Sequence, residues 1–398
     1  MHMFVVPILA TVALTFQGTD SLTLEQALMR ARASRPRILA AGAVVERARG
    51  QSRLTTMIPN PTAQLQADDI APTHVTTIVQ PLAWLPRHFA NAAAGRAGVS
   101  RAAADSTQII ADVGRDVRLA FFASLAADQR LTLIGEQSAI ADSLVRIADR
   151  RVSAGDISAL ERDQVAQEAS RSRLAAWQAR ESARTARADF GRAIAWATPD
   201  VPPPTGQLGD GLDGTPAPND SGDLSRLPAL RAAIADDRAA SARLQSARLA
   251  QLPLPSIIAG REWGGDPEPR RSVILGLSMP IPIWSHGREA VAEAKGAAAE
   301  SAARLAEARL TLTAQLTSAR IRVVETSARA TFARDSLYTE ARRIRVGAVR
   351  LYEAGRTGIV PMLDALRIER EIAQALVQEL LAFQQARADL IALRGDWQ

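Results

Sequence analysis

Proline is spread unevenly along this chain of 398 residues, and its two gaps constrain the fold more than any other feature. No proline occurs between Pro86 and Pro199, or between Pro282 and Pro361. A proline costs about 3 kcal/mol inside a helix, so gaps of this kind permit very long helices. A helix of about 65 residues would reach roughly 100 Å at a rise of about 1.5 Å per residue. The chain is therefore predicted to be elongated and mainly helical.

An internal repeat with an offset of 200 residues organises the sequence. Gly155 corresponds to Gly355, Trp84 corresponds to Trp284, and the run Ala-Arg-Ala-Asp at 186–189 recurs 200 residues later. Matches in one register over this distance indicate a duplicated structural unit.

The repeat divides the chain into four predicted segments. Residues 4–16 are apolar, and the first charged residue is Asp20. This stretch is too short to span a membrane and is typical of the apolar core of a signal peptide. The predicted segments are a signal peptide at 1–19, a first repeat at 20–197, a connector rich in Pro, Gly and Asp at 198–225, and a second repeat at 226–398.

Each repeat shows the same order of elements: a helix, a strand-like hairpin, a very long helix, a glycine turn and a further long helix. Thr23 and Gln26 fit a capping box at the start of the first helix. Periodicity alone would also fit a plain coiled-coil protein. The predicted helices are 24–57, 87–153 and 158–196 in the first repeat, and 228–251, 287–353 and 359–394 in the second.

The hairpins are the part that a coiled coil does not explain. Polar and apolar residues alternate over 62–69 and 272–281, which makes one face of each strand apolar. Strands of about ten residues suit a tilted crossing of an outer membrane. If these strands span a membrane, several chains must share one barrel, because four strands cannot close a barrel and an open edge cannot face lipid. Trp84, Trp263 and Trp284 lie near strand ends, where interfacial aromatic residues would be expected. The alternative is two hairpins in a soluble domain.

Composition and motifs indicate neither an enzyme nor a metal or cofactor site. The chain has no cysteine, and its four histidines do not lie three or four residues apart. Neither a phosphate-binding loop nor a nucleophile elbow occurs. The formal net charge is +6, but Arg alternates with Asp and Glu along the helices. This pattern is typical of solvated helix faces and argues against nucleic-acid binding.

Three stretches of the chain, at residues 22–36, 59–61 and 355–365, resemble TolC-type outer-membrane factors, the outer membrane efflux protein family. Residues 22–28 (Leu-Thr-Leu-Glu-Gln-Ala-Leu), followed by Arg35-Pro36, resemble the opening of these proteins. Residues 59–61 (Pro-Asn-Pro) resemble the approach to their first strand, and residues 355–365 resemble their last helical turn. The resemblance covers nearly the whole mature chain and is closest to the heavy-metal and multidrug branches.

This resemblance implies a mainly α fold with a small membrane β portion. Three chains would form a long α-helical barrel and share a twelve-stranded β-barrel, with four strands per chain. The implied function is a passive outer-membrane channel, extending into the periplasm, of a tripartite efflux or type I secretion system. The implied partners are two further copies, a periplasmic adaptor, an inner-membrane pump of the RND type and outer-membrane lipid. The alternatives are a soluble periplasmic coiled-coil adaptor or scaffold and a cytosolic nucleic-acid binder.

The resemblance also implies two sites. Asp364 matches an acidic position that lines the narrow periplasmic end of the channel, and Pro361 replaces what is often a second acid. The two glycine turns would form helical tips that dock on the adaptor, and these glycines are expected to need positive φ. The predicted adaptor-contacting residues are Ala154, Gly155, Asp156, Ala354, Gly355, Arg356 and Thr357.

Overall fold

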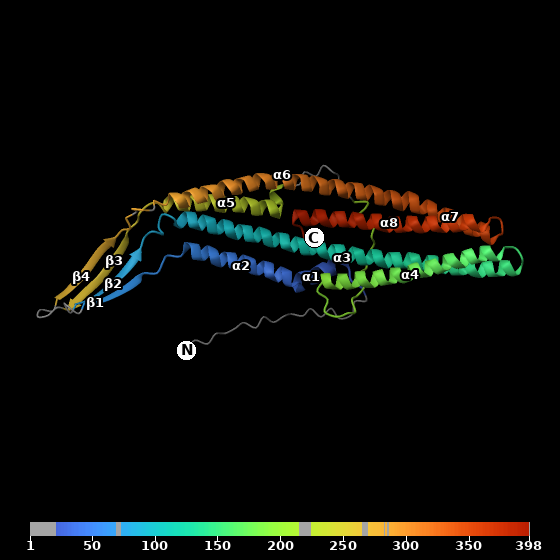
Figure 1. Cartoon of the computed structure of the whole chain (residues 1–398), viewed down its shortest axis with the longest axis horizontal. Coiled ribbons are helices and arrows are strands. Elements are labelled where there is room, and N and C mark those ends of the chain that lie inside the picture. Colours follow the sequence, from blue (N-terminus) through green and yellow to red (C-terminus); the bar gives the residue numbers. More distant parts are fainter. Residues whose placement is uncertain are drawn as a thin grey trace. The chain divides into compact units, whose positions relative to one another are not determined.

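The computed structural model is mainly helical and contains one four-stranded antiparallel sheet (Figure 1). It describes residues 21–68, 73–214, 224–264, 270–281, 283–284 and 286–397. The predicted signal peptide and the strand turns at 69–72 and 265–269 lie outside this described part. The elements are α1 (Leu24–Ser34), α2 (Pro36–Thr56), β1 (Thr62–Asp68), β2 (Thr73–Pro81), α3 (His88–Ser153), α4 (Ala159–Ala193), η1 (Leu224–Arg226), α5 (Pro228–Leu249), β3 (Ser256–Gly264), β4 (Arg270–Ser278), α6 (Arg288–Phe332), η2 (Ala333–Tyr338), α7 (Thr339–Glu353) and α8 (Ile359–Arg394).

The first predicted helix is in fact two helices. The capping box at its start is confirmed: the Thr23 N–H donates to Gln26 Oε1 at 2.9 Å, and the Gln26 N–H donates to Thr23 Oγ1 at 3.3 Å. The prediction of one helix over 24–57 is wrong because Arg35 is extended, with φ −76° and ψ 118°. A residue before proline is disfavoured in the helical region, and Pro36 itself suits the first position of α2.

The long helices follow the proline gaps. Helix α3 runs unbroken for 66 residues, and α4 and α8 return from the glycine turns. The prediction of one regular helix over 287–353 needs a correction, because η2 is a π-helical turn between α6 and α7. The Thr339 Oγ1 donates to the carbonyl oxygen of Arg334, five residues earlier, at 3.3 Å.

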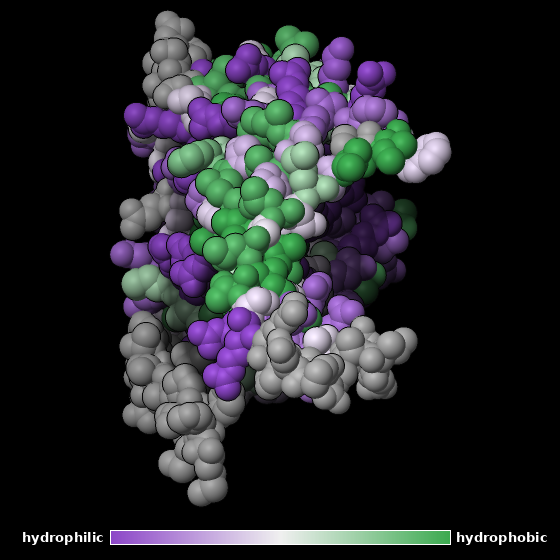
Figure 2. All heavy atoms as spheres, turned by 90° about the vertical axis from the view of Figure 1, so that its left-hand side faces the viewer, coloured by the Kyte–Doolittle hydropathy of each residue, from purple (hydrophilic) through white to green (hydrophobic). Residues whose placement is uncertain are grey.

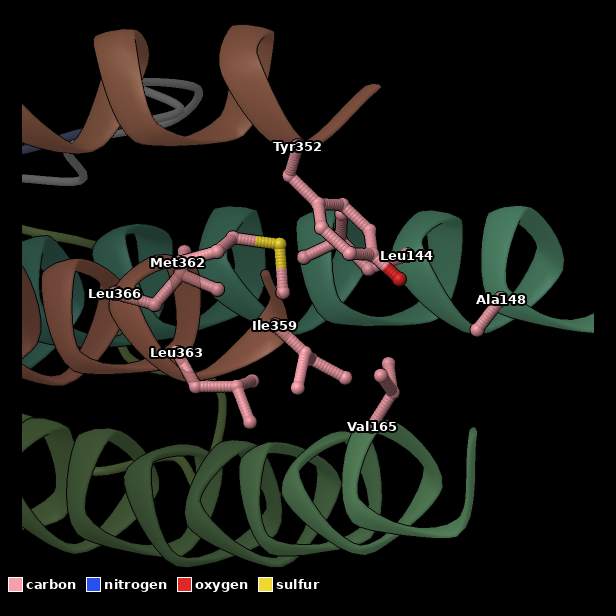
Figure 3. Packing of buried hydrophobic residues seen from close by; sticks show 8 residues of the cluster. All are labelled: Leu144, Ala148, Val165, Tyr352, Ile359, Met362, Leu363 and Leu366. Carbon is pink, nitrogen blue, oxygen red and sulfur yellow. The ribbon is translucent and has the colours of Figure 1, made fainter. Parts of the chain in front are cut away.

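Contacts between residues divide the chain into two compact units, each built from both halves of the sequence. Unit 1 comprises Met1–Ser34, Asp116–Thr215 and Thr326–Gln385, and unit 2 comprises Arg35–Arg115, Pro216–Glu325 and Ala386–Gln398. In unit 2, Leu227, Leu230 and Leu312 form a buried cluster. In unit 1, a larger buried cluster joins α3, α4, α7 and α8 (Figure 3). Its members are Leu144, Ala148, Val165, Tyr352, Ile359, Met362, Leu363 and Leu366.

Residues 198–214 of the predicted connector belong to unit 1 and pack within it. Leu208 and Leu212 are buried, and Leu22 forms an isolated parallel bridge with Pro204. The buried Gln384 side chain donates through Nε2 to the carbonyl oxygens of Leu208 at 2.8 Å and Asp210 at 2.9 Å. A side chain of α8 thus satisfies backbone groups of a segment that has little regular structure.

The sheet, which lies in unit 2, is a meander with the strand order β1-β2-β3-β4. Residues 256–264 of β3 pair with β2 on one side and with β4 on the other. Strands β1 and β4 are therefore the edges of the sheet. None of the described helices is both long and apolar enough to cross a membrane.

Candidate functional site

One face of the sheet is apolar and exposed. The register places Leu275 beside Ala259 and Leu277 beside Ile257, and side chains two residues apart on a strand share a face. Figure 2, which views the end that carries the sheet, shows hydrophobic residues gathered between hydrophilic ones. The large apolar residues of this face are Leu65, Ile78, Ile257, Val273, Leu275 and Leu277, and each is at least 45% exposed.

The opposite face of the sheet is richer in polar groups. Gln64 and Gln66 of β1 lie on this face with Thr77 of β2, in the register of the pairing strands. Ser272 Oγ donates to Glu262 Oε2 at 3.2 Å, which joins β4 to β3. In the wall of a membrane β-barrel, each strand turns apolar side chains toward lipid and polar side chains toward the lumen. The two faces of this sheet follow that pattern.

The three predicted interface tryptophans lie near the two ends of the strands. Trp263 lies opposite His74, with ring centroids 5.9 Å apart, at the end of β3. Trp84 follows β2 and packs edge-on against His88, with centroids 5.8 Å apart. Trp284 follows β4 and is 93% exposed.

Both glycine turns have the backbone conformation expected of them. Gly155 has φ +78° and Gly355 has φ +67°. The Gly155 N–H donates to the Val152 oxygen at 3.0 Å, and the Asp156 N–H donates to the Arg151 oxygen at 2.8 Å. The turn at Gly355 repeats this pattern. Two such bonds around a glycine of positive φ form a Schellman motif, which satisfies the last carbonyl groups of the helix.

A capping box that the sequence analysis missed follows the first turn. Ser158 caps α4: the Glu161 N–H donates to Ser158 Oγ at 3.2 Å, and the Ser158 N–H donates to Glu161 Oε2 at 2.9 Å. The Glu161 carboxylate accepts this bond from the Ser158 N–H and another from Ser158 Oγ at 3.0 Å, and these two bonds lower the pKa of the carboxyl. The spacing Ser-x-x-Glu is visible in the sequence and could have predicted it.

Asp364, the predicted constriction residue, lies on the exposed side of α8. Its side chain is 57% exposed, and its Oδ1 is 3.5 Å from Arg367 Nη1. Arg367 also donates to Glu168 of α4, from Nη2 at 3.3 Å. The structure therefore places Asp364 beside an arginine rather than alone.

Glu168 is a buried acid that the sequence analysis treated as a surface charge. Its side chain is 5% exposed, and Arg370 Nη1 donates to its Oε1 at 2.9 Å. A second buried pair joins Arg345 of α7 to Glu369 of α8, at 3.0 Å. The sequence pattern of a single helix could not predict that Glu168 and Glu369 are buried. In each case the facing helix both covers the carboxylate and provides the arginines that pair with it.

Metal-ligand geometry is not found in the described residues. No group of three or more His, Cys, Asp or Glu side chains among them is placed to hold a metal ion.

Comparison with known proteins shows what the chain is similar to. Residues 223–396 match the family model described as outer membrane efflux protein. The cobalt-zinc-cadmium resistance protein CzcC of Cupriavidus metallidurans is 26% identical over 369 residues, which cover 92% of this chain and 87% of CzcC. The predicted resemblance to the outer membrane efflux protein family is confirmed. The predicted function, an outer-membrane channel of an efflux system, and the predicted location are thereby confirmed.

Solved structures of transmembrane and outer-membrane channels share the fold of this chain. CusC superposes with a TM-score of 0.79 at 16% identity, covering 94% of this chain and 92% of CusC. The CmeC outer membrane channel of Campylobacter jejuni superposes with a TM-score of 0.75 at 14% identity, covering 94% and 85%. The predicted mainly α fold with four strands per chain is confirmed.

Proposed function

We propose that three copies of this efflux protein close one twelve-stranded β-barrel in the outer membrane. The observation that carries the proposal is a sheet with an apolar exposed face and two edge strands, β1 and β4. Lipid cannot satisfy the backbone groups of an edge, so each edge must pair with a strand of another copy. Trp84, Trp263 and Trp284 then lie at the two membrane surfaces, where indole rings are favoured.

The helices form a passive duct that docks, through its tips, on a periplasmic adaptor and an inner-membrane pump of the RND type. Both tip turns are accessible, because nothing lies within 4 Å of a Cβ placed on Gly155 or Gly355. The docking residues are Ala154, Gly155, Asp156, Ala354, Gly355, Arg356 and Thr357.

Asp364 lines the constriction of the duct. Three copies place three carboxylates around one axis, and such a ring attracts cations. Arg367, beside each Asp364, weakens the negative potential of that ring.

The cargo is proposed to be divalent transition-metal cations, because CzcC is named for resistance to cobalt, zinc and cadmium. The proposed cargo can be tested in a metal-sensitive host. This host carries a matching adaptor and pump but lacks its own outer-membrane channel. Expression of the chain should restore growth on these metals, and restoration on organic drugs alone would contradict the cargo.

The trimer is tested by the mass of the purified particle in detergent. Three chains per particle are expected, and a stable, fully helical monomer would contradict the proposal. Leu275→Arg and Ile274→Arg are matched variants, because these neighbours of β4 lie on opposite faces of the sheet. A charge on the lipid face costs about 2–4 kcal/mol near the membrane midplane, so Leu275→Arg should lose trimers while Ile274→Arg keeps them.

The docking tips are tested by cysteine cross-linking in cells, which is simple because the chain has no cysteine. Asp156→Cys and Arg356→Cys should cross-link to the adaptor. Arg271→Cys, in the sheet, is the control. Cross-links from the sheet but not from the tips would overturn the docking model.

A further inference from the structure

The apolar face of the sheet carries its arginines at one end. The register assigns to this face the positions of Ala63, Leu65 and Ala67 on β1, His74, Thr76, Ile78 and Gln80 on β2, Ile257, Ala259, Arg261 and Trp263 on β3, and Arg271, Val273, Leu275 and Leu277 on β4. Arg261 and Arg271 both lie toward the strand turns, away from the helices. Among these positions there is no acidic residue.

The two arginines and His74 surround Trp263. Arg271 and His74 lie directly opposite Trp263 on the two neighbouring strands, and the His74 and Trp263 ring centroids are 5.9 Å apart. Arg261 is the diagonal neighbour of both, and diagonal neighbours on one face are about 7–8 Å apart. Long arginine side chains at this spacing can reach the same anionic group. We call His74, Arg261, Trp263 and Arg271 the basic cluster.

Neither arginine of the basic cluster has an acidic partner among the described residues. Both side chains are exposed, and no ion pair or hydrogen bond joins either guanidinium group to a described side chain. Glu262 belongs to the other face of the sheet, where Ser272 donates to it. By register, the strand positions of Asp68 and Arg270 belong to that other face as well. The acids of the strand turns, which lie outside the described residues, are Asp69, Asp266 and Glu268.

The proposed barrel adds uncharged neighbours to the basic cluster. In that barrel the strand beside β4 is β1 of the next copy, and its positions on the apolar face are Ala63, Leu65 and Ala67. Strand β3 is an inner strand, so both strands beside Arg261 come from its own chain. A charged side chain on a lipid-facing surface is costly unless it reaches an anion or the membrane surface. The membrane itself is the source of such an anion.

The basic cluster lies at the cell-surface end of the proposed barrel. The helices α2, α3, α5 and α6 join the strands at their other ends (Figure 1). Because the helical part extends into the periplasm, the strand turns face outward. Trp263 and Arg271 then lie at the level of the lipid headgroups, where indole rings are favoured. Arg261 lies two positions deeper, about 7 Å along the strand, and its long side chain extends back to that level.

We infer that the basic cluster binds the phosphate groups of a lipid in the outer leaflet of the outer membrane. Arginine is suited to this role because its planar guanidinium group forms paired hydrogen bonds to phosphate oxygens. Trp263 packs against the headgroup, and the apolar positions of Ala259 and Leu275 contact the acyl chains. This site rests on the barrel proposed above and adds to it a bound lipid of defined chemistry at each copy.

The site is tested with the purified trimer in detergent, to which lipid A, a phosphorylated lipid of the outer leaflet, is added. Native mass spectrometry counts the bound lipid. The apparent Kd for lipid A should be weaker by about tenfold or more in the double variant Arg261→Gln with Arg271→Gln. The parent chain should bind dephosphorylated lipid A just as weakly. The matched control, Arg96→Gln with Arg309→Gln, removes two exposed arginines from α3 and α6 and should bind lipid A like the parent.

Three outcomes would overturn the site and leave the trimer standing. Equal binding of lipid A with and without phosphate groups would show a contact with acyl chains only, and this comparison needs no variant that folds. Equal affinity of the two double variants would place the phosphate elsewhere. Displacement of lipid A by an equal concentration of inorganic phosphate would show a site for small anions. One chain per particle in the parent would overturn the barrel and, with it, the lipid site.

Discussion

The guanidinium group of Arg151 lies over the ring of Tyr352, with Cζ 5.0 Å from the ring centroid. Arg151 Nη1 also donates to the backbone oxygen of Tyr352 at 3.4 Å. These residues belong to the last turns of α3 and α7, so a cation–π contact and a hydrogen bond join the two helices just before their tips. Tyr352 is at the same time a member of the unit 1 cluster (Figure 3).

Tyr352→Phe should keep or slightly raise the stability of the protein. The Tyr352 hydroxyl is buried without a hydrogen-bond partner, and removing such a group is neutral or favourable by up to about 1 kcal/mol. Tyr352→Ala should cost about 3–5 kcal/mol, because it leaves a cavity beside Met362 and Leu144. Thermal unfolding followed by circular dichroism separates the two, and a large loss in Tyr352→Phe would reveal a bond to the hydroxyl.

Stability should fall at alkaline pH through Tyr352 and Tyr338. Burial raises the pKa of both phenols above 10. A group whose pKa is higher in the folded state adds stability below its unfolded pKa and loses it as pH rises through the folded value. Tyrosinate absorbance and unfolding should be measured from pH 8 to 12. Each Tyr→Phe variant should lose part of this pH dependence, and ordinary titration at pH 10 in the folded protein would contradict the expectation.

Glu168→Ala should destabilise the protein by about 2–3 kcal/mol, because it leaves Arg367 and Arg370 without the carboxylate they share. Arg367 is 41% exposed, so water replaces part of the lost interaction. Asp142→Ala is the control. Its pair with Arg173, at 2.8 Å, is exposed and should contribute less than about 1 kcal/mol. Similar unfolding temperatures for the two variants would show that Glu168 does not stabilise the tip region.

Gly155→Ala and Gly355→Ala should each destabilise the tips by about 1–2 kcal/mol, since their positive φ strains a residue with a Cβ. Gly135→Ala is the matched control within α3, where nothing lies within 4 Å of the added Cβ. It should stabilise the helix by about 0.5–1 kcal/mol. Hydrogen exchange at the tips and thermal unfolding measure both effects. If the change in stability had the same sign in all three variants, the positive φ of the two turn glycines would be contradicted.

Asp364→Asn should reduce the cation selectivity of single channels and weaken their block by trivalent cations, with folding unchanged. The three carboxylates of the proposed ring supply this selectivity. Arg367→Gln should act in the opposite direction, because it removes the cation beside each carboxylate. Unchanged selectivity in both variants would remove Asp364 from the constriction.

The sequence predicted the features that depend on local chemistry. The proline gaps located the long helices, the alternation located the strands, and the capping box at Thr23 and the conformation of Gly155 followed from the residue types. Pro36 also marks the break at Arg35, because a residue before proline is disfavoured in the helical region.

Two kinds of feature have no signal in the local sequence. Residues 333–338 contain neither glycine nor proline, and nothing in them marks a π turn. In the sequence, Glu168 and Glu369 cannot be told from acidic residues on solvated helix faces. Their burial is possible because arginines of the facing helices pair with them. The adaptor contacts and the role of Asp364 depend on other chains, so they remain predictions.

The π turn also makes the two halves of the duplicated chain inequivalent. Helix α3 and the stretch from α6 to α7 have the same number of residues, yet Leu144 is buried and Ile344 is exposed. Three copies of a perfect duplication would form a ring with sixfold pseudosymmetry. In the proposed trimer the π turn η2 lowers this symmetry to threefold, so a partner that touches every helical hairpin must recognise two different surfaces.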